Sequence, residues 1–197
     1  MSANKVKTRG FSSRKLAGTA VLTALSLISF LLEGLLPPMF IPGAKLGLGN
    51  IFTMLALIVY SPASAFAAVT VKCIVGNLIA GSLSSMIYSL AAGLVGMCVS
   101  SLSVRLCPRI SVTAVCVASA VIHNTVQCLV FCAVSATWQA AAYLPYLVML
   151  GALSGTAVGA AVTLLLKKVP ICYFAKLDPD IGYCDNIPAR DDKTQQL

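Results

Sequence analysis

Long stretches without charged residues constrain the fold of this chain more than any other feature of its sequence. Only three charged residues occur in the range 16–104, namely Glu33, Lys45 and Lys72, and none occurs in the range 111–166. Overall, 58% of the residues are hydrophobic and 10% are charged, whereas a soluble domain usually carries about 25% charged residues. A single water-soluble core cannot bury this much apolar surface, so we expect the lipid bilayer to be the solvent of this chain.

The lengths of the apolar runs predict an all-α integral membrane protein with six transmembrane helices. A helix needs about 20 residues to cross the hydrocarbon core, whereas a strand of a membrane barrel would show about 10 residues of alternating polarity. The expected helices cover residues 16–36, 49–60, 63–82, 85–106, 111–136 and 140–166. The second is short, and neither a proline nor a charge marks the boundary between the third and the fourth.

Lysine and arginine residues predict the orientation of these helices. With six spans, nearly all basic residues outside the spans gather on one side, and the preference of such residues for the cytoplasm identifies that side. They are Lys5, Lys7, Arg9, Arg14, Lys15, Arg105, Arg109, Lys167 and Lys168. We therefore expect a multi-pass protein of a bacterial plasma membrane with both termini in the cytoplasm.

Three parts of the chain follow from this pattern. A basic tail of residues 1–15 precedes a membrane domain of residues 16–168, and a polar tail of residues 169–197 follows it. The first apolar run exceeds the core of a cleaved signal peptide, so we expect it to be a retained helix. The net charge of +8 is interpreted as contact with anionic lipid. No nucleic-acid partner is expected, because the cations of the first tail are not interleaved with aromatic residues.

Residues 42–50 form a glycine-rich, lysine-containing segment between two apolar runs. The segment includes Lys45, Gly47 and Asn50. At membrane depth, an interrupted segment of this kind is tolerated where it is buried in protein or lines a cavity, so it predicts a ligand site. The alternative is an ordinary outer loop that turns the chain back.

Polar side chains within the spans indicate where such a site would form. Glu33 lies near the end of the first span, Lys72 lies in the third, and His123, Asn124 and Gln127 share one arc of the fifth. Intramembrane polar groups are costly and usually face the bundle interior. We expect them to converge with Lys45 on one outward-facing pocket. The alternatives are a structural ion pair between Glu33 and Lys72, and interhelical hydrogen bonds from the fifth span.

Small residues form stripes on two of the expected helices. They are Gly151, Gly155 and Gly159 on the sixth, and Ala17, Ala20 and Ala24 on the first. Such stripes allow helices to approach closely. For the glycines we favour packing within the chain, and for the alanines the alternative is docking to another membrane protein.

The eight cysteines predict neither a disulfide framework nor a metal site. They are scattered, six of them lie in or beside predicted spans, and the closest pair is Cys128 and Cys132. Two thiols on one helix face do not complete a tetrahedral site. We expect these cysteines to behave as small apolar side chains, and we expect no cofactor.

Several of these residues together resemble a known membrane family. They are Glu33, the segment 42–50, residues 89–93 (Ser-Leu-Ala-Ala-Gly), the pair His123-Asn124, and Gln127. In order and spacing over residues 16–168, the chain resembles the Gx transporter family, also labelled heptaprenyl diphosphate synthase component I.

The resemblance implies a six-helix fold similar to the S components of energy-coupling factor transporters, which bind substrate. It also implies that Ala17, Ala20 and Ala24 dock against a shared transmembrane coupling subunit, which works with ATPases. Related chains tend to carry arginine where this chain has Lys72, and lysine recognises a phosphate or carboxylate less well because it binds as a point charge.

We expect a non-catalytic, substrate-binding membrane subunit for uptake of a small molecule. The expected site residues are Glu33, Lys45, Gly47, Asn50, Lys72, His123, Asn124 and Gln127. The alternative is an accessory membrane component of isoprenoid or quinone metabolism beside a soluble prenyl synthase. Prenyl transfer itself is not expected, because diphosphate chemistry needs metal-binding carboxylates and the spans contain only Glu33. A carrier that works alone would show inverted repeats, and the two halves of the chain show none.

Overall fold

The computed structural model describes residues 13–35, 47–107 and 110–168. Lys45, most of the segment 42–50 and both predicted tails lie outside these ranges. The helices are α1 (Ser13–Leu35), α2 (Gly49–Val59), α3 (Pro62–Ile79), α4 (Leu83–Leu106), α5 (Val112–Val134), the 3-10 helix η1 (Trp138–Tyr143) and α6 (Leu144–Lys168). The expected all-α fold is confirmed. Five of the helices are long and apolar enough to cross a membrane, and α2 is the short sixth helix.

Serine side chains cap the N-termini of three helices. Ser61 caps α3 by accepting a hydrogen bond from the backbone N–H of Ser64, and Pro62 takes the first helical position, where its missing N–H costs nothing. Ser82 caps α4 and Ser111 caps α5 in the same way. The boundary that the sequence left unmarked, between α3 and α4, is a turn through Gly81, whose φ of +70° suits a residue without a Cβ.

The start of the sixth span differs from the expected single helix. Residues 138–143 form the 3-10 helix η1, and α6 begins only at Leu144. Ser135 ends α5, with its backbone N–H bonded to the carbonyl of Phe131, and Ala136 follows with a φ of +50°. Pro145 is the second residue of α6, where the missing N–H again breaks no helical bond. A proline at this position explains why the regular helix starts here.

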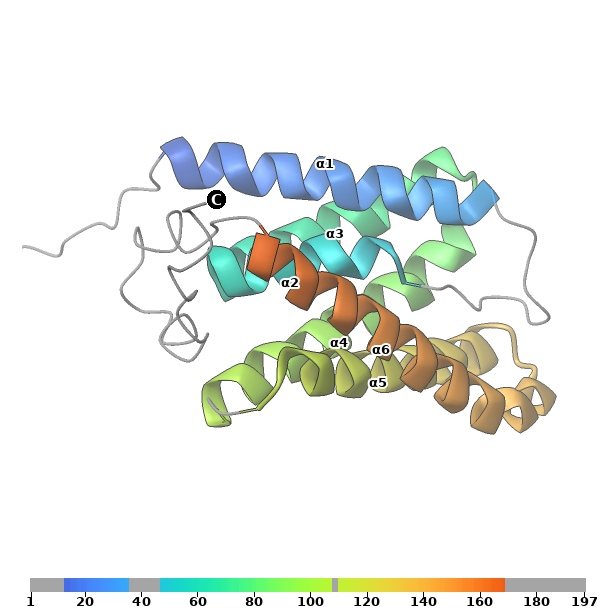
Figure 1. The fold of residues 1–197 in the computed structure, drawn as a ribbon. Coiled ribbons are helices and arrows are strands. Elements are labelled where there is room, and N and C mark those ends of the chain that lie inside the picture. Colours follow the sequence, from blue (N-terminus) through green and yellow to red (C-terminus); the bar gives the residue numbers. More distant parts are fainter. Residues whose placement is uncertain (1–12, 36–46, 108–109, 169–197) are drawn as a thin grey trace, which may run out of the picture.

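Figure 1 shows the helices as a bundle in which chain neighbours mostly lie side by side. Helix α1 packs on α2 and α3, α3 on α4, α4 on α5 and α5 on α6, while α6 also contacts α2. The short α2 is thus surrounded by long helices. Its residues 53–59 are all buried, as expected for a helix that is apolar around its whole circumference. With 11 residues it rises only about 16 Å, roughly half of the hydrocarbon core.

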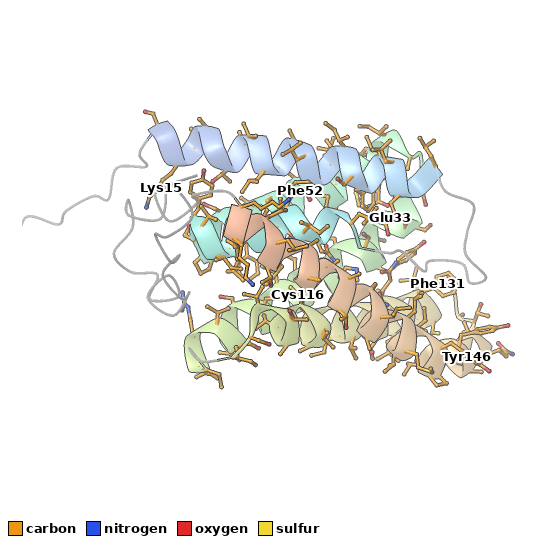
Figure 2. All side chains as sticks on the ribbon, viewed as in Figure 1. Lys15, Glu33, Phe52, Cys116, Phe131 and Tyr146 are labelled. Atoms are coloured by element: carbon orange, nitrogen blue, oxygen red, sulfur yellow. The ribbon has the colours of Figure 1, made fainter. Side chains whose placement is uncertain are left out.

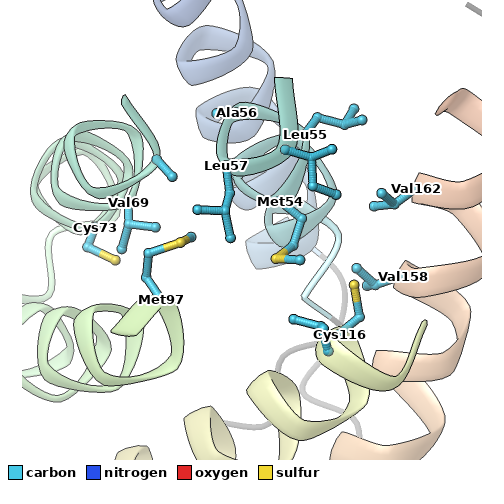
Figure 3. Close-up of a cluster of buried hydrophobic side chains, with 13 residues drawn as sticks. Met54, Leu55, Ala56, Leu57, Val69, Cys73, Met97, Cys116, Val158 and Val162 are labelled. Atoms are coloured by element: carbon cyan, nitrogen blue, oxygen red, sulfur yellow. The ribbon is translucent and has the colours of Figure 1, made fainter. Parts of the chain in front are cut away.

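The main apolar core joins α2 to α3, α4, α5 and α6. Figure 3 shows Leu57 of α2 facing Val69 and Met97, while Met54 points toward Cys116 and Val158. These contacts hold α2 in the middle of the bundle.

The glycine stripe of α6 packs against α5. A Cβ at Gly151 would lie 3.1 Å from the carbonyl oxygen of Ala120, and one at Gly155 would lie 2.7 Å from Cα of Val117. A Cβ at Gly159 would lie 2.6 Å from Cα of Thr113 on α5. The backbones of the two helices are therefore close enough that only glycine fits along this line.

Apart from Lys72, the basic residues whose side chains the structure describes lie at one end of the bundle. The first turn of α1 and the last turns of α4 and α6 meet at the same end in Figure 1, and Lys15 is labelled there in Figure 2. Arg105 lies in the last turn of α4, and Lys167 and Lys168 lie in the last turn of α6. This arrangement agrees with an even number of crossings, and the cytoplasmic assignment of that end stays a prediction.

Candidate functional site

A cavity of about 30 Å³ lies between the start of α2 and the facing sides of α5 and α6. Four residues of the predicted site line it, namely Gly47, Asn50, His123 and Asn124. We call this cavity the chamber. Its volume suits one or two water-sized groups.

The chamber is covered by the turn that leads into α2. Gly47 has a φ of +77°, a conformation that favours glycine, and its carbonyl accepts a hydrogen bond of 2.8 Å from the backbone N–H of Asn50. The backbone N–H of Gly47 donates to the carboxylate of Glu33, which is buried near the end of α1. Ser26, also on α1, donates its hydroxyl to the carbonyl of Gly49 at 2.8 Å. Helix α1 thus holds the turn at two points.

Lys72 holds the same turn from α3. Its side chain is 4% exposed, and its ammonium donates to the Oδ1 atom of Asn50 at 2.8 Å. The carboxylate of Glu33 is near enough to interact with this ammonium electrostatically. The acid and the base that the sequence placed in the pocket therefore bind the covering turn, and neither is among the residues that line the chamber.

The fifth helix supplies the polar wall. His123 and Asn124 line the chamber, and the Nδ2 atom of Asn124 donates to the carbonyl of Leu147 on α6 at 3.2 Å. Gln127 lies one turn further along α5 and is buried, but it does not line the chamber. This interhelical bond from Asn124 is of the kind that the sequence left open as an alternative.

Two serines complete the polar wall, and the sequence analysis did not single them out. Ser119 lies one turn before His123 and donates to the carbonyl of Gly96 on α4 at 2.9 Å. Ser154 of α6 donates to the carbonyl of Gly151 at 3.3 Å. The spacing of Ser119 from His123 was a usable signal, since residues four apart share a helix face.

Apolar side chains form the opposite side of the chamber. Met54 from α2, Cys116 from α5 and Val158 from α6 line it, and Figure 3 shows the three converging. All three belong to the main apolar core. The chamber is therefore an extension of that core that ends in a polar wall.

The predicted docking residues lie on a different surface. Ala17, Ala20 and Ala24 are exposed on α1, beside exposed Val21 and Ile28. Docking by this face stays a prediction.

Within residues 13–35, 47–107 and 110–168, no group of three or more His, Cys, Asp or Glu residues could hold a metal ion. The nearest candidates in the sequence, Cys128 and Cys132, pack instead with Leu147 in a small apolar cluster. The chamber therefore offers hydrogen bonds and apolar contact as its means of recognition.

The fold and the chamber define a multi-pass helical membrane protein with a small polar-walled cavity between its short helix and its last two helices. Residues 22–165 match the model of the family described as heptaprenyl diphosphate synthase component I, and the chain belongs to this family. None of the curated proteins compared matches the chain. None of the solved structures compared matches it either.

Proposed function

We propose that this chain is the substrate-binding membrane subunit of a small-molecule uptake transporter, similar to an S component. The observation that carries the proposal is the chamber, where polar groups from α5 and α6 face the turn before α2. Buried polar groups in a membrane bundle are costly, and they gather where a ligand or water uses them. Structural pairing alone would not require a cavity among them.

Each predicted site residue has a role in this proposal. Asn50, His123 and Asn124 contact the substrate, and Gln127 supports them from the next turn of α5. Glu33 and Lys72 fix the covering turn through Gly47 and Asn50. The backbone N–H groups at the start of α2 add a weak positive dipole end. Lys45, which lies outside the described residues, attracts polar or anionic substrates toward the outer mouth.

Transport would require partner subunits. The sequence has no P-loop of the G-x-x-x-x-G-K-[ST] type, so ATP energy would come from elsewhere. The exposed face around Ala17, Ala20 and Ala24 is the proposed docking surface for a transmembrane coupling subunit.

The family description supports a second candidate, an accessory membrane component beside a soluble prenyl diphosphate synthase. In that role the chain would be non-catalytic itself. The described spans contain no carboxylate cluster of the kind that binds magnesium diphosphate. The apolar side of the chamber would then face a prenyl chain, and the docking partner would be soluble.

Gentle extraction followed by native mass spectrometry tests the two candidates. Co-purification of a large membrane subunit with a pair of ATPases, together with a bound small molecule, supports uptake. Co-purification of a soluble prenyl synthase supports the accessory role and contradicts uptake.

Variants test the site itself. His123→Ala and Lys45→Ala should abolish thermal stabilisation by the co-purified molecule while leaving the fold intact. Thr156→Ala is the matched control, because Thr156 is exposed on α6 and its hydroxyl bonds only to the carbonyl of Ala152. Unchanged ligand stabilisation in the first two variants would contradict the site.

A further inference from the structure

Most of the hydrogen-bonding side chains that line the chamber already make one bond within the protein. That bond decides whether the remaining group of each side chain donates to a ligand or accepts from it. This polarity limits the chemistry of any group that enters. The inference drawn from it rests on the proposed substrate-binding function.

Asn50 presents a donor to the chamber. Its Oδ1 atom accepts the bond from the ammonium of Lys72, and an ammonium can only donate. The orientation of the amide is therefore set, and its NH₂ group is left for a ligand.

Asn124 presents an acceptor. Its Nδ2 atom donates to the carbonyl of Leu147, which can only accept. A Cβ placed on Gly151 would lie 3.1 Å from the same nitrogen. The amide nitrogen therefore faces the backbone of α6, and the Oδ1 atom faces away from it.

The two serine hydroxyls also present acceptors. Ser119 gives its proton to the carbonyl of Gly96, and Ser154 gives its proton to the carbonyl of Gly151. A hydroxyl has one proton and two lone pairs, so each oxygen retains a lone pair for a ligand.

No Asp, Glu, Lys or Arg lines the chamber within the part of the chain that the structure describes. Beside the imidazole of His123, an anion would meet three oxygen acceptors and one amide donor group. A cation would have the buried ammonium of Lys72 just behind Asn50. Both kinds of charge are therefore disfavoured in a space this small.

We infer that the chamber recognises a neutral head group that carries at least two N–H or O–H donors and one acceptor, of which a primary amide is the simplest example. Its carbonyl accepts from the NH₂ group of Asn50. Its two N–H groups donate to the oxygens of Asn124 and of one serine.

Three small probes of nearly equal size test this inference, namely formamide, formate and methylammonium. Each is added to the full chain in lipid nanodiscs, and saturation-transfer NMR measures binding. Formamide should bind in preference to the two ions. At least one of the variants Ser119→Ala and Ser154→Ala should weaken formamide binding by about 3- to 10-fold, the effect of one lost neutral hydrogen bond.

Ser100→Ala is the matched control for Ser119→Ala. The hydroxyl of Ser100 also donates to the carbonyl of Gly96, at 3.0 Å, but Ser100 does not line the chamber. Formamide binding should be unchanged in this variant, and circular dichroism checks that all three variants fold.

Preference for formate or methylammonium, reduced by the same serine variants, would overturn the inferred ligand class and leave the proposed binding function standing. Saturation transfer to none of the probes would overturn the inference about the chamber, while a small molecule found by native mass spectrometry would still support the proposed function. Equal losses in Ser100→Ala and Ser119→Ala would overturn it as well, because the effect would then arise from α4 packing.

Discussion

The bond between Lys72 and Asn50 makes the sharpest energetic prediction. The ammonium of Lys72 is 4% exposed and donates to Asn50 at 2.8 Å. Asn50→Leu removes this acceptor and leaves the buried ammonium with only the electrostatic attraction of Glu33, which costs about 2–3 kcal/mol of unfolding free energy. Lys72→Met removes the charge and leaves a half-buried amide oxygen unpaired, which costs about 1–2 kcal/mol.

The double variant separates this reasoning from simple damage to the fold. When both partners are replaced by apolar side chains of similar shape, neither end of this bond is left unsatisfied, and Glu33 keeps its bond from the N–H of Gly47, so the change is expected to be nearly neutral. Asn50→Leu with Lys72→Met should therefore be more stable than Asn50→Leu alone. The coupling free energy of the double-mutant cycle should then approach the sum of the two single effects, about 3–5 kcal/mol.

Reversible unfolding in mixed micelles of dodecyl maltoside and SDS measures these free energies, with helicity as the signal. The reasoning is refuted if the two single effects add to within about 0.5 kcal/mol, the usual range for independent sites. It is also refuted if Asn50→Leu costs no more than Lys72→Met, because the buried ammonium would then have another acceptor.

The helix contacts and exposed side chains make three further predictions. Gly155→Ala should destabilise the bundle by about 1–3 kcal/mol, because the added Cβ would lie 2.7 Å from Cα of Val117. Gly34→Ala is the control: its added Cβ has nothing within 4 Å, so this variant should be neutral or slightly stabilising in the same unfolding assay. Trp138 is the single tryptophan, is 64% exposed at the start of η1, and is expected at the membrane interface. Its fluorescence should be quenched most by lipids brominated near the headgroup, and strongest quenching by bromines deep in the acyl chains would contradict this position. In a variant whose tail cysteines, Cys172 and Cys184, are replaced by serine, Cys107 is exposed at the basic end of α4 and should react with an impermeant maleimide only after cells are opened. Labelling of Cys107 in intact cells would reverse the predicted orientation.

The spans could be read from the sequence because their signals are local. Length and apolar content define the five long helices, and prolines mark several of their ends. The 3-10 helix η1 was not predicted, since an apolar run looks the same whether it is one helix or a 3-10 turn followed by a helix. Pro145 was the one local sign of that break.

The lining of the chamber was predicted in part, and its role as a substrate site stays a prediction. Gly47, Asn50, His123 and Asn124 line the chamber, and the sequence singled them out because an interrupted segment and amides in a span are rare. Ser119 and Ser154 were missed for a physical reason. A serine in a membrane helix can bond to backbone carbonyls, so it carries little cost and little signal in the sequence.

The position of Lys72 shows what sequence cannot supply. A lysine in a span predicts a buried polar contact, but its long side chain reaches several directions, and the packing of α3 against α1 and α2 selects one of them. In the structure that direction leads to Asn50, so the charge acts on the chamber through an amide. Lys72 therefore identified the neighbourhood of the chamber in the sequence, and only the helix packing decides whether its side chain lines that chamber.

The covering turn is held by opposite charges from two different helices, and this has a mechanical consequence. Glu33 of α1 holds the backbone N–H of Gly47, Ser26 of α1 holds the carbonyl of Gly49, and Lys72 of α3 holds the side chain of Asn50. The inward face of α1 thus fixes the turn, while the outward face of the same helix carries the exposed alanine stripe.

A partner that docked on that stripe and displaced α1 would pull the turn relative to α5 and α6, because α1 carries two of the three bonds. Ser26→Ala should weaken this connection without touching the chamber. The variant should therefore change the release of a bound ligand upon partner docking more than it changes the affinity of the isolated chain for that ligand. Equilibrium binding of the ligand with and without the partner would measure both effects. An equal change in both measurements would show that Ser26 acts only on the stability of the turn.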